Sequence, residues 1–206
     1  MVAGLNSVLI PDTEASPHDP LKGILTVPAL FDTNSYFVVG DQAYCTDVLG
    51  TAQIAYALAL GGSENPAART DTLLTREERD KGNLIIVGGP AVNPTATEFD
   101  GYFGISYYLE YNGSFEIRCE RNSIYLDLEN YPYEDICIIY LGKLSSRNVL
   151  LVWGYGWRGT LAGSMFMGDP ANWQEYSDAH MIMLRWKDYD RDGLVETEEI
   201  TVERYI

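Results

Sequence analysis

Cysteine, histidine and basic residues are all scarce in this chain. Its 206 residues include three cysteines and two histidines, and 14 lysines and arginines stand against 30 aspartates and glutamates, a formal net charge of −16. Proteins that bind nucleic acid or anionic membrane surfaces do so with Lys and Arg. The charge balance therefore predicts no nucleic-acid partner, and it favours cations as ligands.

The three cysteines do not form a metal-binding pattern. Cys45, Cys119 and Cys137 include no C-x-x-C pair, which disfavours zinc and iron–sulfur sites. Cys119 and Cys137 fall in strand-like segments, and the sequence leaves open whether they form a disulfide or stay as buried free thiols. A Cys–His catalytic pair would have to join Cys45 to His18 or His180, and no nucleophile motif surrounds these residues. Enzymatic activity is therefore the less favoured interpretation.

Long apolar runs are also missing. No stretch of about 18 apolar residues occurs, so we expect no membrane insertion. The first twenty residues show neither the basic n-region nor the sustained apolar core of a secretory signal. We expect a cytoplasmic protein, or one at the cell surface or outside the cell if a leader is missing from this sequence.

The pattern of apolar and polar residues predicts one α/β domain. We expect an extended N-terminal arm over residues 1–35, where prolines are scattered among polar residues, and a single domain over residues 36–206. Short apolar runs that end in glycine indicate buried strands at 36–40 and 84–87. The helix pattern at 47–60 has an apolar face made of Val48, Ala52, Ala55 and Ala59, with Leu49, Ile54 and Leu58 beside them.

Further local signals follow along the chain. Thr75 and Glu78 have the spacing of a capping box at the start of a short helix. A helix is also expected to begin near Ala91, and the strand–helix alternation predicts a Rossmann-like layered sheet. Asn112-Gly113 lies between alternating stretches and predicts an inserted antiparallel hairpin. Later strands are expected at 136–140, 149–154, 182–186 and 200–203, with a helix at 160–167.

Residues 188–199 match the twelve-residue calcium loop D-x-D-x-D-G-x5-E. Calcium binds six to eight hard oxygen ligands, and a tight loop can direct several carboxylates to one point. Gly193 at position 6 permits the sharp turn. The predicted ligands are the backbone carbonyl of Leu194 and the carboxylates of Asp188, Asp190, Asp192, Glu196 and Glu199.

The competing interpretation of this loop is a solvated acidic turn, since Asp and Gly favour turns without a metal. Five acids at the template positions would repel one another in the absence of a cation, which favours calcium. A strand pattern precedes the loop, and only seven residues follow Glu199. The expected architecture is therefore strand–calcium loop–strand, with a structural ion and not a helix-opening sensor.

A second candidate site lies where strands are expected to end. Gly40, Asp47 and the Gly88-Gly89-Pro90 segment follow predicted strands, and open α/β sheets bind ligands at such ends. Close backbone packing and helix capping explain the same residues without a ligand. The aromatic side chains of VWGYGWRG could stack on a sugar or pack in a core or interface; they are Trp153, Tyr155 and Trp157. The alternative function is thus a small-molecule or sugar-binding enzyme.

Several segments together resemble archaeal surface-layer (S-layer) proteins. The resemblance covers roughly residues 36–167 and is carried by Asp47–Ala55 (DVLGTAQIA), Ile86–Asn93 (IVGGPAVN) and Leu151–Tyr155 (LVWGY). The chain differs from that family in its short length and in lacking a signal, a membrane anchor and a Ser/Thr-rich stalk. The resemblance implies a non-enzymatic structural role at a cell surface, through protein–protein contacts.

Tyrosines are concentrated between residues 102 and 140. Tyrosine is enriched at protein interfaces because its large ring is amphipathic. We expect some of these side chains to pack against a partner or a second copy of the chain; they are Tyr102, Tyr107, Tyr108, Tyr111, Tyr131 and Tyr133. Protein partners or self-assembly are therefore the predicted interactions.

Overall fold

The protein has a mixed α/β fold. The computed structural model describes residues 23–63 and 66–206. Its centre is a seven-stranded sheet with the order β10-β9-β7-β8-β3-β1-β2. The strands are β1 (Ser35–Val39), β2 (Ala67–Thr70), β3 (Asn83–Val87), β7 (Glu134–Leu144), β8 (Arg147–Gly154), β9 (Met181–Lys187) and β10 (Ile200–Tyr205). Strands β2, β1, β3 and β8 are parallel to one another, while the pairs β8–β7, β7–β9 and β9–β10 are antiparallel.

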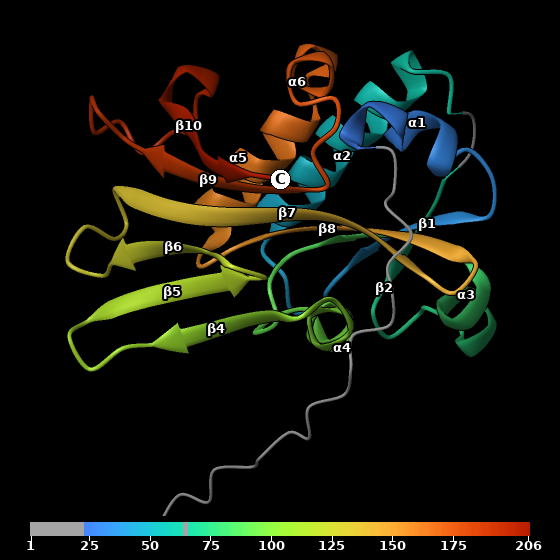
Figure 1. The fold of residues 1–206 in the computed structure, drawn as a ribbon, viewed down its shortest axis with the longest axis horizontal. Coiled ribbons are helices and arrows are strands. Elements are labelled where there is room, and N and C mark those ends of the chain that lie inside the picture. Colours follow the sequence, from blue (N-terminus) through green and yellow to red (C-terminus); the bar gives the residue numbers. More distant parts are fainter. Residues whose placement is uncertain (1–22, 64–65) are drawn as a thin grey trace, which may run out of the picture.

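Helices cover one face of this sheet, and a mixed layer covers the other (Figure 1). The first face carries α1 (Val27–Leu30), α2 (Cys45–Leu60), α5 (Trp157–Met167) and α6 (Pro170–Glu175). The second carries α4 (Pro94–Phe103) and a three-stranded antiparallel sheet of β4 (Ile105–Leu109), β5 (Ser114–Cys119) and β6 (Asn122–Asp127). Side chains of a strand alternate between its faces, so Ile85 and Val87 enter one hydrophobic cluster and Leu84 and Ile86 the other.

Local sequence signals placed most of these elements. The strand expected at 84–87 is confirmed, since its apolar side chains are fully buried and it lies parallel to both β1 and β8. Asn112-Gly113 lies in the turn between the antiparallel strands β4 and β5, where Gly113 has φ of +83°. Positive φ is readily adopted by glycine, which explains its place in this turn.

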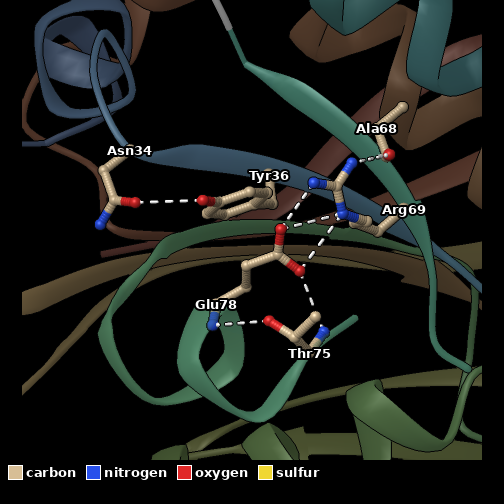
Figure 2. Close-up of polar contacts among 6 residues, drawn as sticks. All are labelled: Asn34, Tyr36, Ala68, Arg69, Thr75 and Glu78. Atoms are coloured by element: carbon tan, nitrogen blue, oxygen red, sulfur yellow. Dashed lines mark hydrogen bonds and ion pairs between the residues drawn. The ribbon is translucent and has the colours of Figure 1, made fainter. Parts of the chain in front are cut away.

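The short helix α3 (Arg76–Lys81) begins at the predicted capping box. Thr75 Oγ1 accepts a hydrogen bond from the Glu78 backbone N–H, and the Glu78 carboxylate accepts one from the Thr75 N–H. Figure 2 shows that the same carboxylate also binds the Arg69 guanidinium of β2, with Nη2 to Oε1 at 2.6 Å, while the Tyr36 hydroxyl bonds to Asn34. One glutamate thus caps its helix and ties it to the edge of the sheet.

The structure corrects two expectations about the first sixty residues. The part of the expected extended arm within the described residues forms a 3-10 helix, η1 (Ile24–Thr26), followed by α1, and Ile24, Val27 and Phe31 are fully buried under the first helical layer. The rest of that arm, including His18, lies outside the described residues. Scattered prolines among polar residues predict an extended arm, but Pro28 lies in the first turn of α1, where a helix tolerates proline.

The expected apolar face of α2 is confirmed only in part, because Ile54 and Leu58 are fully buried but Ala52 and Ala59 are exposed. Val48 and Leu49 are exposed, whereas Asp47, Gly50, Ile54, Ala57 and Leu58 are buried. The alanine-rich helix is apolar almost all round, so its periodicity did not choose a face. The choice came from α5, because a Cβ at Gly50 would lie 2.6 Å from Ser164 Oγ and only glycine permits this approach.

Cys119 and Cys137 do not form a disulfide, because the main sheet lies between them. Cys119 belongs to the hydrophobic cluster on one side of the seven-stranded sheet and Cys137 to the cluster on the other. Both are buried free thiols. Two cysteines separated by a sheet layer cannot reach the Cα distance of roughly 4.4–6.8 Å that a disulfide requires.

Candidate metal centre

The acidic loop at 188–199 connects β9 to its antiparallel neighbour β10. It leaves the sheet after Lys187, turns, and returns through a short 3-10 helix, η2 (Thr197–Glu199). The backbone N–H of Asp188 donates to the Tyr133 carbonyl at 2.9 Å, which joins the start of the loop to the segment that leads into β7. Both ends of the loop are therefore held by strands of the main sheet.

Three of the predicted ligands come together. Asp188, Asp190 and Asp192 each offer a carboxylate oxygen, and these oxygens all lie within 4.8 Å of one another. Asp188 is only 4% exposed, while the other two side chains face solvent. Three carboxylates this close repel one another unless protons or a cation neutralise them.

Hydrogen bonds within the loop hold these aspartates in place. Asp188 Oδ2 accepts from the Gly193 N–H at 3.0 Å, and Asp192 Oδ1 accepts from the Leu194 N–H at 2.8 Å. Gly193 adopts φ of +79°, as its predicted role in the turn requires. The second oxygen of the buried carboxylate, Asp188 Oδ1, has no hydrogen-bond partner within residues 23–63 and 66–206. A buried charged oxygen without a partner is costly, so this atom is suited to accept a ligand.

Glu199 lies outside the group of three aspartates. Its side chain is buried, Oε1 accepts from the Tyr189 N–H at 2.8 Å, and Oε2 accepts from the Trp186 indole Nε1 at 2.9 Å. A carboxylate has lone pairs left after two such bonds, so coordination of a metal by Glu199 stays a prediction. Trp186 was missed by sequence analysis, because no motif indicates an indole that donates to a loop thirteen residues later.

Glu196 and Leu194 are the remaining predicted ligands. Glu196 is exposed, and its pKa is raised first by partial desolvation and then by the negative charges of Asp192 and Asp190. The Leu194 side chain is 60% exposed and has no ligand atom, so only the backbone carbonyl of this residue could bind a metal. Their predicted role as ligands is neither supported nor contradicted by these contacts.

The second candidate region, at the strand ends, is packed more closely. A Cβ at Gly40 would lie 1.8 Å from the Val92 carbonyl oxygen, and one at Gly88 would lie 2.7 Å from Asp47 Oδ2. The nearby cavity, which Asp47, Val92 and Gly89 help to line, has a volume of about 80 Å³. Asn93, the last residue of the Ile86–Asn93 segment, donates from Nδ2 to the carbonyls of Val38 and Val87 and so bridges β1 and β3.

The cysteine and histidine candidates lie apart. Cys45 follows β1 and starts α2 at the carboxyl edge of the parallel strands. His180 precedes β9, which runs in the same direction as β8, so it lies at the opposite edge, where its Nε2 is 3.3 Å from Glu120 Oε1. A Cys45–His180 catalytic pair is therefore excluded by topology.

Comparison with known proteins assigns no family: no protein-family model matches the chain, and no curated protein matches it. Among the helices of the described residues, none is long and apolar enough to cross a membrane. Function therefore has to be inferred from the side chains and their arrangement.

Proposed function

We propose that this protein is a calcium-stabilised, non-enzymatic structural domain. The observation that carries the proposal is the arrangement of Asp188: its carboxylate is buried, Oδ1 lacks a hydrogen-bond partner in the described part of the chain, and two further aspartate carboxylates lie within 4.8 Å. A divalent cation would supply the missing partner and neutralise the repulsion. Oxygen ligands from flexible acidic loops suit calcium better than magnesium, which demands a smaller octahedral shell and dehydrates reluctantly.

The ion would be held by Asp188, Asp190 and Asp192, with Glu196, Glu199 and the Leu194 carbonyl completing the shell. Both flanking strands belong to one sheet and pair directly, from Ile200 opposite Trp186 onward. A loop fixed at both ends in this way has no pair of helices to open. Calcium would therefore stabilise the C-terminal strands of the fold and would not act as a conformational signal.

The proposed role is in protein–protein contacts, as the resemblance to surface-layer proteins implies. Exposed aromatic side chains support it: Tyr108 is 47% exposed and Tyr111 is fully exposed beyond the end of β4. Other tyrosines of the same region are also exposed, namely Tyr102, Tyr107, Tyr125 and Tyr133. A partner protein or a second copy of the chain would bury them, and a place at the cell surface belongs to the same proposal.

The enzymatic alternative has less support. Sites for small molecules usually have volumes of roughly 300–1,000 Å³, and the cavity at the strand ends has about 80 Å³. Gly40 and Gly88 pack against backbone or against Asp47, which accounts for both glycines without a substrate.

Thermal unfolding with calcium and with a chelator tests the metal proposal. Calcium at about 100 times its dissociation constant should stabilise the fold by roughly 2.7 kcal/mol, which for a chain of this size is a rise in Tm of roughly 5–10 °C. Magnesium at the same concentration should give a smaller rise. An unchanged Tm, together with calorimetry that detects no binding up to millimolar calcium, would end the proposal.

Light scattering tests the proposed contacts separately. Self-assembly predicts a mass that increases with protein concentration in calcium and falls when Tyr108 and Tyr111 are replaced by serine. If the protein is monomeric at every concentration with and without calcium, self-association is ruled out and only a heterologous partner remains.

A further inference from the structure

A small cavity opens at the carboxyl edge of the sheet, between β1, β3 and β8. The connection that leaves β1 leads to β2 on one side, and the connection that leaves β3 leads toward β8 on the other. Ligands of open α/β sheets bind at this kind of reversal, because diverging connections leave a crevice there. The cavity is lined by Tyr44, Asp47, Gly89, Ala91, Val92, Gly154, Tyr155, Gly156, Trp157 and Thr160.

Asp47 provides the charge of this cavity. The residue is only 2% exposed, and its Oδ1 atom has no hydrogen-bond partner among the residues that the structure describes. Burial raises the pKa of this carboxyl to about 6, so it is ionised in mildly alkaline solution. An ionised carboxylate only accepts hydrogen bonds, so the group it lacks is a donor.

Aromatic rings form the outer walls. Tyr44 is 63% exposed and Tyr155 is 38% exposed, which places them at the mouth, and Trp157 is partly buried beside them. The faces of such rings attract cations, and the attraction increases where water is excluded. The Arg158 guanidinium already lies over the Trp157 ring, 4.2 Å from its centroid, and Tyr155 packs against Phe115 and Tyr131. The exposed ring of Tyr44 is therefore the wall that an organic cation would meet beside the buried carboxylate.

Helices α2, α4 and α5 begin beside the cavity, after β1, β3 and β8, and their N-termini would by themselves favour an anion. Two are already satisfied from within the protein. Asp135 accepts hydrogen bonds from the Gly156 and Gly159 N–H groups of the first turn of α5, and Asn93 Oδ1 accepts one from the Thr95 N–H of α4. Asp47 itself lies in the first turn of α2, where the helix dipole favours its negative charge, but its Oδ1 atom still has no hydrogen-bond donor among the described residues.

We propose that this cavity binds a primary ammonium group, either of a small free amine or of a lysine side chain presented by a partner protein. A volume of about 80 Å³ is roughly that of three waters. This is enough for an ammonium and the methylenes next to it, but not for a sugar ring. The net charge of −16 favours a cationic ligand over an anionic one.

The test uses n-propylammonium chloride as the probe and 1-propanol as its neutral counterpart, added to the full chain at pH 8. Backbone amide shifts of Gly89, Gly154 and Gly156 report binding by NMR. The ammonium should produce saturable shifts at these glycines, and 1-propanol should bind at least about tenfold more weakly. A blocked lysine and a blocked norleucine, compared in the same way, show whether a lysine side chain also enters.

Two variants link the binding to named residues. Asp47→Asn keeps the shape and removes the charge, so the shifts should disappear, whereas Asp100→Asn, at another buried aspartate outside the cavity, should leave them intact. Tyr44→Leu alters an exposed wall with little risk to folding and should weaken binding roughly two- to fivefold. The proposal is overturned if propylammonium gives no saturable shifts, if 1-propanol binds equally, or if a folded Asp47→Asn protein binds as well as the wild type.

The same titrations keep this site separate from the calcium proposal. The Asp47→Asn variant should retain the full calcium-dependent rise in Tm, because Asp47 lies outside the 188–199 loop. If the protein fails to bind ammonium but still responds to calcium, only the proposal for the cavity is overturned. If it binds ammonium but does not respond to calcium, only the proposal for the loop is overturned.

Discussion

The indole Nε1 of Trp186 donates a hydrogen bond to Oε2 of Glu199 across 2.9 Å, and both side chains are buried. This bond fixes the last residue of the acidic loop to the last buried residue of β9. It gives Glu199 a structural role in closing the loop that holds with or without a metal.

Replacing Trp186 by phenylalanine should therefore affect both stability and calcium. Glu199 Oε2 loses its partner in a buried position, and we expect a destabilisation of about 1–3 kcal/mol from that loss, with more from the smaller ring. Mutating a group that orients a metal ligand typically lowers the affinity for the metal by 10–100-fold, so calcium should bind this variant at least about tenfold more weakly. Urea unfolding and calcium calorimetry measure the two effects.

Trp153→Phe is the matched control for that variant. Trp153 is also buried and donates from Nε1 to a carboxylate, Asp100 Oδ1 at 3.1 Å, but it lies away from the acidic loop. It should lose stability without losing calcium affinity. Equal calcium affinity in the two variants would contradict the role assigned to the Trp186–Glu199 bond.

Asp188→Asn should abolish most of the stabilisation by calcium. The amide oxygen can still accept from the Gly193 N–H, so the loop should keep its shape while it loses one charge and one strong ligand. Without calcium the variant should be at least as stable as the wild type, because three clustered carboxylates become two. Tm measured with and without calcium checks both statements, and Tyr189→Phe, at a side chain 67% exposed, should keep the wild-type response.

Two glycine-to-alanine substitutions should change stability in opposite directions. Gly88 has φ of +101°, and a Cβ there would lie 2.7 Å from Asp47 Oδ2, so Gly88→Ala should cost about 1–3 kcal/mol. Gly101 lies in α4 with nothing within 4 Å of an added Cβ, so Gly101→Ala should gain roughly 0.5–1 kcal/mol. Chemical denaturation gives both values. If Gly88→Ala left the unfolding free energy unchanged, the backbone at residue 88 would be less constrained than its positive φ and its close approach to Asp47 imply.

The buried Asp100 should make stability depend on pH. Burial raises the pKa of this carboxyl to about 7, against an ordinary value of 3.8, with the Trp153 indole opposing the shift. Between about pH 4 and 7 the folded protein therefore binds more protons at this position than the unfolded chain. Its contribution to stability is present at low pH and is lost as the pH rises through 7, at up to about 1.4 kcal/mol per pH unit.

Asp100→Asn removes that contribution while the amide oxygen can still accept from Trp153. The variant should equal the wild type near pH 4 and exceed it in unfolding free energy at pH 8. Asp47 and Asp135, whose pKa values burial raises to about 6, act in the same direction and are unchanged in the variant. Unfolding curves at several pH values that stay parallel for the two proteins would refute the assignment to Asp100.

The sequence by itself determined the elements whose signals are local. The run at 84–87 is apolar on both faces of a strand, and Thr75 with Glu78 has capping-box spacing, so both could be recognised without knowing their neighbours. The acidic loop is also a local pattern, because its template depends only on the spacing of carboxylates and one glycine. Such features depend on residues a few positions apart, and the chain itself keeps those close.

The tertiary structure decided everything that depends on which distant segments meet. Cys119 and Cys137 looked like possible partners until the sheet placed them on opposite faces. The buried face of α2 was chosen by its approach to α5 at Gly50, because an almost uniformly apolar helix contains no preference of its own. In the sequence Asp47 is only an acidic residue at the start of a helix. The residues that follow β3 and β8 enclose it in a cavity in the folded protein. Pairing between remote strands creates these surroundings, and no short stretch of sequence encodes it.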